Sequence, residues 1–375
     1  MKQYKVILFI CISLITVLQS CRDDDMVFLS EAEQVTPPNN TSGFAGFYLL
    51  NEGNMGMNLA TLDYFEFPTG VYYRDIYSEK NPNVVKELGD VGNDLKRYGN
   101  KLYAVINSSN KIEVMNAYTA KRITDISVPN GRYLAFDKGK AYISSYAGKV
   151  GVDEGKGFVA EIDTTTLELT RKVTVGYQPE EIVVHNNKLY VANSGGYRAP
   201  NYDNTVSVID LNSFEVIKTI EVDVNLHRMK VDSKGDIYVS SRGDYGDIPS
   251  RLYVIDSNTD KIKTKLDIPI SDMYVCGDSL YYYSVLWDGS DAVYGILNTN
   301  TKKVVTTNFI TDGTDKDIVM PYGLAVDPET RDIYVTDAQN YVVSGYIYCF
   351  SHDGKKKWKT MAGNIPAHIT FVPKK

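Results

Sequence analysis

A short strand pattern centred on tyrosine occurs seven times along the chain, and this repeat restricts the fold more than any other feature. The copies lie at residues 47–49, 102–105, 141–143, 189–191, 237–239, 280–282 and 333–335. All but the first follow a polar turn, such as 186–188, of the kind that joins the two strands of a hairpin. Repeats of roughly 40–50 residues are typical of propeller blades.

Each tyrosine strand is followed by a second apolar strand and a second turn. The fourth repeat is the clearest, with a second strand at 206–210, a third at 216–220 and, before them, a leading strand at 181–184. Four short strands per repeat predict an all-β, seven-bladed β-propeller. A solenoid of stacked strands is the alternative, but it requires shorter repeats of near-constant length. No segment keeps a 3.6-residue apolar period, so we expect few helices.

The two ends of the repeat region predict how the ring closes. The first repeat has no innermost strand of its own, and the last apolar segment, 367–372, matches the missing strand. If this C-terminal strand pairs with the first tyrosine strand, it closes the first blade and removes an open sheet edge. We therefore assign residues 44–375 to one propeller domain.

The N-terminus has the features of a processing signal. Lys2 and Lys5 precede an apolar stretch, 6–17, that is too short to span a membrane. The motif Leu18-Gln19-Ser20-Cys21 resembles the lipobox of bacterial lipoproteins, in which residues 1–20 are removed and Cys21 carries the lipid. An ordinary secretory signal with a chance cysteine is the alternative. Cys276 and Cys349 have no metal-ligand spacing, and we expect them to be buried.

The segment 21–43 is expected to be a spacer between the lipid and the domain. Its acidic run, 23–25, resembles the surface-export signal of some gut-bacterial lipoproteins; the alternative is an ordinary solvated charge run. Pro37 and Pro38 favour an irregular chain. These features predict a protein of the outer membrane, held by its lipid anchor alone and facing the cell exterior.

The strand order also predicts one functional face. Counting strands A to D outward from the axis, the B–C and D–A loops meet at the same face, and these loops are long and varied. They are rich in aromatic residues, arginine and amides, the residue types of binding hot spots. The predicted ligand-binding residues are Asn54, Met57, Arg132, Tyr133, Tyr146, Gln178, Tyr197, Arg198, Tyr202, His227, Arg228, Arg242, Tyr245, Trp287, Tyr322, Tyr341 and His368.

Other classes of function are disfavoured. The net charge of −7 argues against nucleic-acid binding, which needs a basic surface. Only four histidines are present, and no nucleophile motif or metal-ligand spacing accompanies them, so we expect no enzyme, no metal and no catalytic residues. The loop carboxylates Asp244, Asp247, Asp288 and Asp291 are interpreted as loop-capping groups, with calcium ligation as the alternative.

Two motifs carry a family resemblance. Segments 190–193 (YVAN) and 334–337 (YVTD) resemble the YVTN-type propeller repeat. Segments 49–54, 59–63 and 88–94 resemble the YncE-like surface lipoproteins that include the BtuG type. That resemblance implies capture of cobalamin, as a transported ligand and not a cofactor, and its transfer to a BtuB-like TonB-dependent transporter. It assigns no contact residues; His227 or His368 is a candidate for approaching the cobalt.

Two other functions stay open at this point. One is a propeller that binds surface glycans through aromatic platforms. The other is a metal-dependent enzyme of the lactonase or lyase kind, in which Asn93, Asn107 and Asn193 contribute to an axial metal site.

Overall fold

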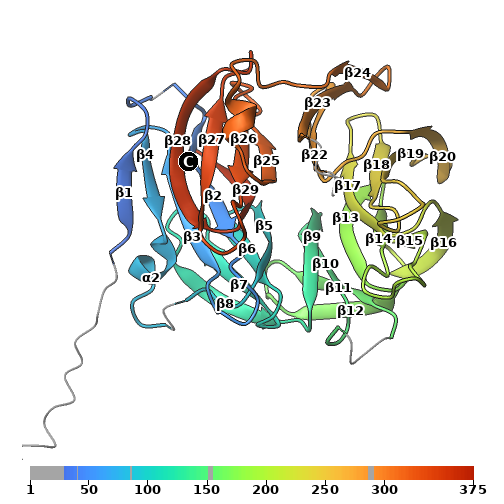
Figure 1. The fold of residues 1–375 in the computed structure, drawn as a ribbon. Helices are drawn as coiled ribbons and strands as arrows, with labels where there is room; N and C mark the ends of the chain where they lie inside the picture. Colours follow the sequence, from blue (N-terminus) through green and yellow to red (C-terminus); the bar gives the residue numbers. More distant parts are fainter. Residues whose placement is uncertain (1–28, 40, 85–86, 151–154, 286–290) are drawn as a thin grey trace, which may run out of the picture.

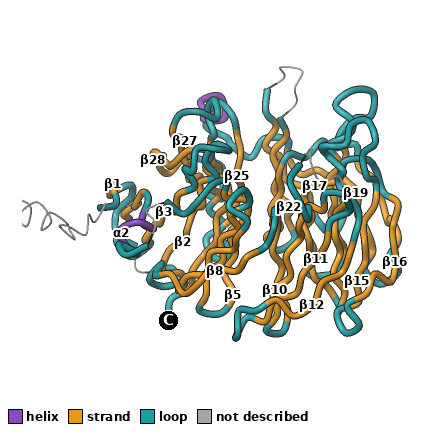
Figure 2. Tube along the Cα trace, turned by 90° about the horizontal axis from the view of Figure 1, so that it is seen from below, coloured by secondary structure: helices purple, strands orange, loops and turns teal. Residues whose placement is uncertain are grey.

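The computed structural model describes residues 29–39, 41–84, 87–150, 155–285 and 291–375. These residues form seven antiparallel sheets that follow one another in chain order around a central axis (Figure 1). The all-β, seven-bladed propeller is therefore confirmed. The strands run between two loop-rich faces, as the view in Figure 2 shows.

Six blades are simple four-stranded meanders. Blade 2 consists of β5 (Gly92–Tyr98), β6 (Lys101–Ile106), β7 (Lys111–Asn116) and β8 (Arg122–Ser127). Blade 3 consists of β9 (Gly131–Asp137), β10 (Lys140–Ser145), β11 (Phe158–Asp163) and β12 (Leu169–Thr174). Blade 4 consists of β13 (Pro179–His185), β14 (Lys188–Asn193), β15 (Thr205–Asp210) and β16 (Glu215–Glu221).

The remaining meanders follow the same order from the axis outward. Blade 5 consists of β17 (Leu226–Val231), β18 (Asp236–Ser241), β19 (Arg251–Asp256) and β20 (Lys261–Leu266). Blade 6 consists of β21 (Asp272–Cys276), β22 (Ser279–Ser284), β23 (Val293–Asn298) and β24 (Lys303–Thr306). Blade 7 consists of β25 (Pro321–Val326), β26 (Ile333–Asp337), β27 (Ser344–Phe350) and β28 (Lys356–Asn364).

Blade 1 closes the ring as the sequence predicts. Its innermost strand is the C-terminal β29 (Pro366–Pro373), which pairs with β2 (Phe44–Asn51) so that Leu49 faces Ile369 and Phe47 faces Phe371. Outward follow β3 (Thr61–Glu66) and β4 (Val71–Arg74). Two ends of the domain more than 300 residues apart are therefore neighbours in one sheet.

A fifth strand on blade 1 is not predicted by the sequence pattern. β1 (Glu31–Gln34) lies in the segment expected to be a spacer and pairs with β4, so it covers an edge that would otherwise present unpaired backbone groups. All four of its residues are exposed, so the sequence has no alternation of apolar and polar residues that would predict the strand. The described helices are short: α2 (Ile76–Lys80) and the 3₁₀ turn η1 (Thr314–Asp317).

The core lies between blades. Seven clusters of buried side chains are present among the described residues, and each joins two neighbouring blades. The repeated tyrosines fill these clusters. Tyr190 of blade 4 donates to Asp260 of blade 5, and Tyr238 of blade 5 donates to the Thr299 carbonyl of blade 6. The recurrent tyrosine thus serves the scaffold by placing its ring in the core, and at Tyr190 and Tyr238 the hydroxyl also bonds to the next blade.

Cys276 and Cys349 are free and buried, as expected. No described helix has the length and apolar character needed to cross a membrane. The predicted signal segment 1–20 and Cys21 lie outside the described residues.

Truncation before Ile369 is expected to abolish cooperative unfolding, because it removes most of the innermost strand of blade 1 and exposes the edge of β2. Chemical unfolding followed by circular dichroism would measure this. Truncation after Pro373 is the control, since it removes only residues beyond β29. A sharp, unshifted transition in the shorter protein would contradict closure by β29.

Candidate ligand-binding face

The B–C loops and the first residues of the innermost strands meet at one face, as predicted. Glu52, from the B–C loop of blade 1, contacts His368 on β29. Tyr146 and Arg242, from the B–C loops of blades 3 and 5, both approach Glu180 on β13. We call this surface the loop face, and the side chains that meet at its centre the axial network.

Backbone irregularities aim these side chains at the axis. The pairing register of β9, β13, β17, β25 and β29 shifts at the loop-face end, where a residue bulges out of the ladder. The shifted stretches contain Glu180 and Glu181 on β13, and His227 and Arg228 on β17. Bulges commonly redirect side chains next to functional sites.

Glu180 organises one part of the axial network. Arg132 binds its carboxylate through Nε at 3.2 Å and Nη2 at 3.0 Å. The Tyr146 hydroxyl donates to the other carboxylate oxygen, and Arg242 Nη1 lies 3.9 Å from that oxygen. Burial disfavours the charged form of Glu180, but Arg132 and Arg242 outweigh burial, so the pKa of Glu180 lies below its usual value.

Tyr133 joins blades on different sides of the axis. Its hydroxyl accepts a hydrogen bond from Arg228 Nη1 at 2.7 Å and lies 3.5 Å from His227 Nε2. Its ring packs edge to face against His368, with 6.5 Å between ring centroids. Arg228 is held in turn by Asp272, whose Oδ1 lies 3.0 Å from Arg228 Nε. Residues of blades 1, 3, 5 and 6 are therefore connected through one phenol.

Glu52 organises the third part of the axial network. It receives the Tyr322 hydroxyl at 2.8 Å and lies 3.2 Å from His368 Nε2. Tyr322 packs against Tyr341, and the Asn54 amide donates to the Tyr341 carbonyl. Ten predicted site residues thus belong to this connected centre: Asn54, Arg132, Tyr133, Tyr146, His227, Arg228, Arg242, Tyr322, Tyr341 and His368.

The acidic partners of this centre were missed from the sequence. Glu52, Glu180 and Asp272 neutralise the arginines and orient the tyrosines, yet they were not among the predicted residues. Glu52 stands in a B–C loop, and Glu180 and Asp272 stand at the starts of innermost strands. Their positions in a B–C loop and at the starts of innermost strands could have identified them, because side chains at such positions lie close to the axis.

Several predicted ligand contacts are buried within the scaffold. Tyr133, Tyr146, His227 and Arg228 are each at most 9% exposed. The axial cavity below Tyr133 measures about 70 Å³ and is lined by Lys96, Glu181, Arg228, Lys230 and Asp272, among others. Pockets that enclose a small molecule typically measure about 300–1,000 Å³, so a large ligand has to lie across the face.

The accessible part of the loop face is its rim. Tyr197 is 68% exposed, Tyr245 is 59% exposed and Met57 is 62% exposed. Tyr197 contacts the Tyr146 ring edge to face, and its backbone N–H donates to the Gln178 side chain at 2.7 Å. Arg198 and Tyr202 are partly buried beside it. Trp287 lies outside the described residues.

The residues considered for metal binding form hydrogen bonds within the propeller. Asn93 donates to the Arg132 carbonyl, Asn107 to the Gly131 carbonyl, and Asn193 to Thr205 and Ser207. Asp244 accepts the backbone N–H groups of Ile248 and Gly246, which lower its pKa, as a loop-capping group does. Within the described ranges, no group of three or more His, Cys, Asp or Glu side chains is placed to hold a metal ion.

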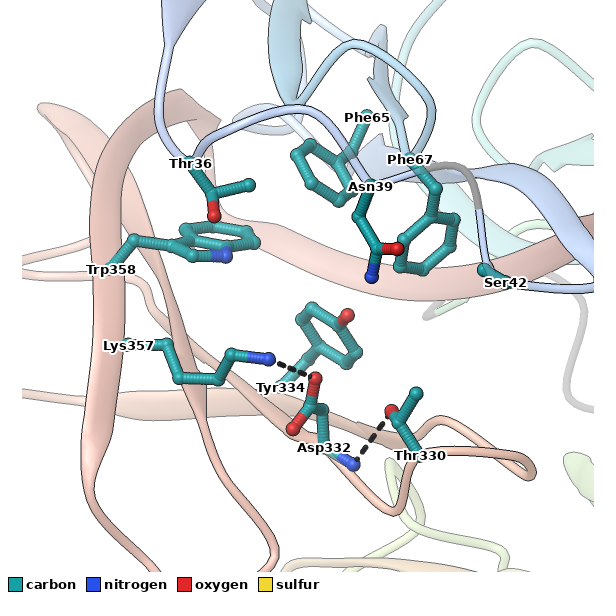
Figure 3. Close-up of a pocket in the computed structure, with 10 residues that line it drawn as sticks. All are labelled: Thr36, Asn39, Ser42, Phe65, Phe67, Thr330, Asp332, Tyr334, Lys357 and Trp358. Atoms are coloured by element: carbon teal, nitrogen blue, oxygen red, sulfur yellow. Dashed lines mark hydrogen bonds and ion pairs between the residues drawn. The ribbon is translucent and has the colours of Figure 1, made fainter.

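A second small cavity lies between blades 7 and 1 (Figure 3), and Thr330 and Asp332, from the turn between β25 and β26, place it near the opposite face. It measures about 60 Å³, and the N-terminal segment forms one wall through Thr36 and Asn39. Phe65, Tyr334 and Trp358 pack around it, and Lys357 pairs with Asp332 at its edge. Its volume suits a few water molecules, so it belongs to the seam of the closed ring.

A family model covers almost the whole propeller. The model described as "Domain of unknown function (DUF5074)" matches residues 45–371. The chain belongs to this DUF5074 family. No curated protein matches the chain significantly.

Solved structures similar to this DUF5074 protein share its fold at low sequence identity. A quinonprotein alcohol dehydrogenase-like protein from Bacteroides thetaiotaomicron is 16% identical, with a TM-score of 0.61, over 88% of this chain and 79% of that one. Apo AztD from Citrobacter koseri is 13% identical, with a TM-score of 0.55, over 87% and 98%. Hydrazine synthase from Kuenenia stuttgartiensis is 17% identical, with a TM-score of 0.54, over 70% and 77%. At these identities the similarity shows the fold alone.

Glu180→Gln is expected to lower the free energy of unfolding by about 3–5 kcal/mol, because it leaves Arg132 buried without its counter-charge. Urea unfolding monitored by circular dichroism would measure the loss. Asp125→Asn is the control, since it breaks an exposed ion pair with Arg122 and is expected to cost less than about 1 kcal/mol. Equal effects of the two variants would contradict the central role of Glu180.

His227 is expected to make stability depend on pH. Burial, then Arg242, Arg228 and Arg132, holds the pKa of His227 well below its usual 6.5. As the pH falls below about 6.5, His227 is therefore protonated in the unfolded chain but stays neutral in the folded protein. The free energy of unfolding then decreases with falling pH, by up to about 1.4 kcal/mol per pH unit.

The measurement is the free energy of unfolding in urea at pH 7.5, 6.5 and 5.5. His227→Gln is expected to show a shallower loss on acidification than the unsubstituted protein, whatever its absolute stability. Identical slopes for the two proteins would show that His227 is protonated equally in the folded and unfolded states.

Proposed function

We propose that this protein captures a corrinoid such as cobalamin across its loop face and passes it to a BtuB-like TonB-dependent transporter. One observation carries the proposal: exposed aromatic and methionine side chains surround a centre whose charges are already neutralised. Tyr197, Tyr245 and Met57 stand on the rim, while Arg132 and Arg228 are ion-paired at the axis.

This arrangement suits a broad, uncharged or weakly charged ligand. The axial network is rigid because its hydrogen bonds and ion pairs cross between blades, so binding orders few additional side chains. A corrinoid presents a wide ring with methyl groups, peripheral amides and one phosphodiester. Tyrosines and methionines contact such a ring without demanding a fixed hydrogen-bond pattern, and the Gln178 and Asn54 amides stand beside them.

The proposed cellular setting follows from the N-terminal sequence. Lipid attached at Cys21 would hold the protein at the outer membrane, and the segment between Cys21 and β1 would separate the propeller from the bilayer. A membrane-anchored propeller with a free loop face can meet ligand in the medium and a transporter in the membrane.

Calorimetric titration of the protein with cyanocobalamin tests the proposed function. Binding at micromolar affinity or tighter is expected. The competing function is a glycan-binding surface, which the same exposed Tyr197 and Tyr245 would serve as sugar platforms. Binding of a polysaccharide panel member without any response to cyanocobalamin would replace the corrinoid proposal with that one.

Tyr197→Ala and Tyr245→Ala are each expected to weaken corrinoid binding by about tenfold, because each removes an exposed aromatic contact worth about 1–2 kcal/mol. Neither change should shift the unfolding transition much, since both side chains are mostly exposed. Tyr118→Ala is the control for affinity, because Tyr118 stands in the turn between β7 and β8 at the opposite face, where it is partly buried against the core. Unchanged affinity in both rim variants would show that the ligand does not use this rim.

A further inference from the structure

Arg198 and Lys156 lie over the same aromatic ring at the edge of the loop face. The Arg198 guanidinium carbon is 3.6 Å from the centroid of the Tyr177 ring, and Lys156 Nζ is 6.0 Å from that centroid. Arg198 comes from the B–C loop of blade 4, Lys156 from the B–C loop of blade 3, and Tyr177 from the loop before β13. Two cations from different blades therefore converge on one ring.

Neither cation has an anionic partner in the described part of the chain. The other three predicted arginines of the loop face are all paired: Arg132 and Arg242 with Glu180, and Arg228 with Asp272. Arg198 instead donates through Nη1 to the Asn201 carbonyl at 3.1 Å. No described acceptor engages its remaining guanidinium nitrogens, so a fork of N–H donors is available to a ligand.

The loop that carries Arg198 is held in one shape. Gly195 has φ +55°, and a Cβ there would lie 2.3 Å from the Asp203 nitrogen, so the turn requires glycine. The Arg198 N–H donates to the Gly195 carbonyl at 2.8 Å, and the Asp203 N–H donates to the Ser194 carbonyl at 3.0 Å. The loop is thus folded back on itself before any ligand arrives.

The Asp203 carboxylate, which contacts the backbone of Tyr177, already has hydrogen-bond donors on both oxygens. Asp203 accepts the Tyr177 N–H at 2.8 Å through one oxygen, and the Thr205 N–H and hydroxyl through the other. It fixes the backbone of Tyr177 and forms no ion pair with Arg198 or Lys156. Among the described residues, the local arrangement is therefore a stacked guanidinium and an ammonium without a counter-anion.

We infer that Arg198, Lys156 and Tyr177 form an oxyanion subsite that takes a phosphodiester of the bound ligand. A guanidinium binds two non-bridging phosphate oxygens at once, while an ammonium adds a point charge. Stacking on Tyr177 fixes the guanidinium plane. The inference rests on the proposed corrinoid function for the identity of the ligand, since cobalamin carries one phosphodiester in its nucleotide loop.

The experiment compares cobalamin with cobinamide, a corrinoid that lacks the nucleotide loop and its phosphodiester. Calorimetry should show that the unsubstituted protein binds cobalamin at least about tenfold more tightly than cobinamide. Arg198→Gln combined with Lys156→Gln is expected to reduce this preference to about twofold or less by weakening cobalamin binding alone. Arg198→Lys keeps the positive charge but loses the forked N–H donors of the guanidinium, so it is expected to give an intermediate preference for cobalamin over cobinamide.

Lys172→Gln is the matched control. Lys172 Nζ lies 3.8 Å from the centroid of the Phe158 ring, but it stands on β12, the outermost strand of blade 3. Its substitution removes one positive charge, where the double variant removes two, and it should leave the preference unchanged. If the double variant keeps the cobalamin preference of the unsubstituted protein, the subsite is overturned while the corrinoid function stands.

A separate titration decides the subsite if neither corrinoid binds and the proposed function fails. Inorganic pyrophosphate, at matched ionic strength, is the probe. Binding by the unsubstituted protein and by Lys172→Gln, with loss in the double variant, supports an oxyanion subsite for another phosphate-bearing ligand. Equal response of all three proteins, or no response in any, overturns it.

Discussion

The pairing of β29 with β2 is the constraint on which the rest of the structure depends. It makes the chain a closed ring, so each blade packs its apolar faces against two neighbours and none is left as a free end. It also brings His368 to the axis, where Glu52 and Tyr133 meet it. Closure therefore determines both the stability of the propeller and the composition of its centre.

Electrostatics at the axis divide the loop face into two zones with different roles. Burying Arg132, Arg228 and Glu180 is costly, and the structure offsets that cost by pairing them. These groups consequently stabilise the scaffold, and their charges are already paired and not available to a ligand. The rim is different: Tyr197 and Tyr245 are exposed, and Arg198 has no anionic partner among the described residues. Ligand recognition is proposed for the rim, with the paired centre as its rigid base.

Much of the fold could be predicted from the sequence, because the strand repeat and the residue types of the turns are local patterns. The seven tyrosine strands, the meander order and the C-terminal closing strand were all predicted, and all are present. The site was predicted less fully. The loop face was located correctly, since topology alone assigns loops to faces, but burial of Tyr133 and His227 was not foreseen. Glu180 was missed because its partners, Arg132 and Arg242, come from other blades.

The sequence by itself determined the number of blades, the closing strand and the set of loops that share a face, because these depend on strand period and chain order. Only the tertiary structure decided which side chains at the axis neutralise one another and which remain exposed. Bulges at the ends of β9, β13 and β17 turn individual residues inward, and their effect depends on contacts across the ring. No local pattern encodes a distance between residues on opposite blades, so pairing and exposure appear only when the ring is complete.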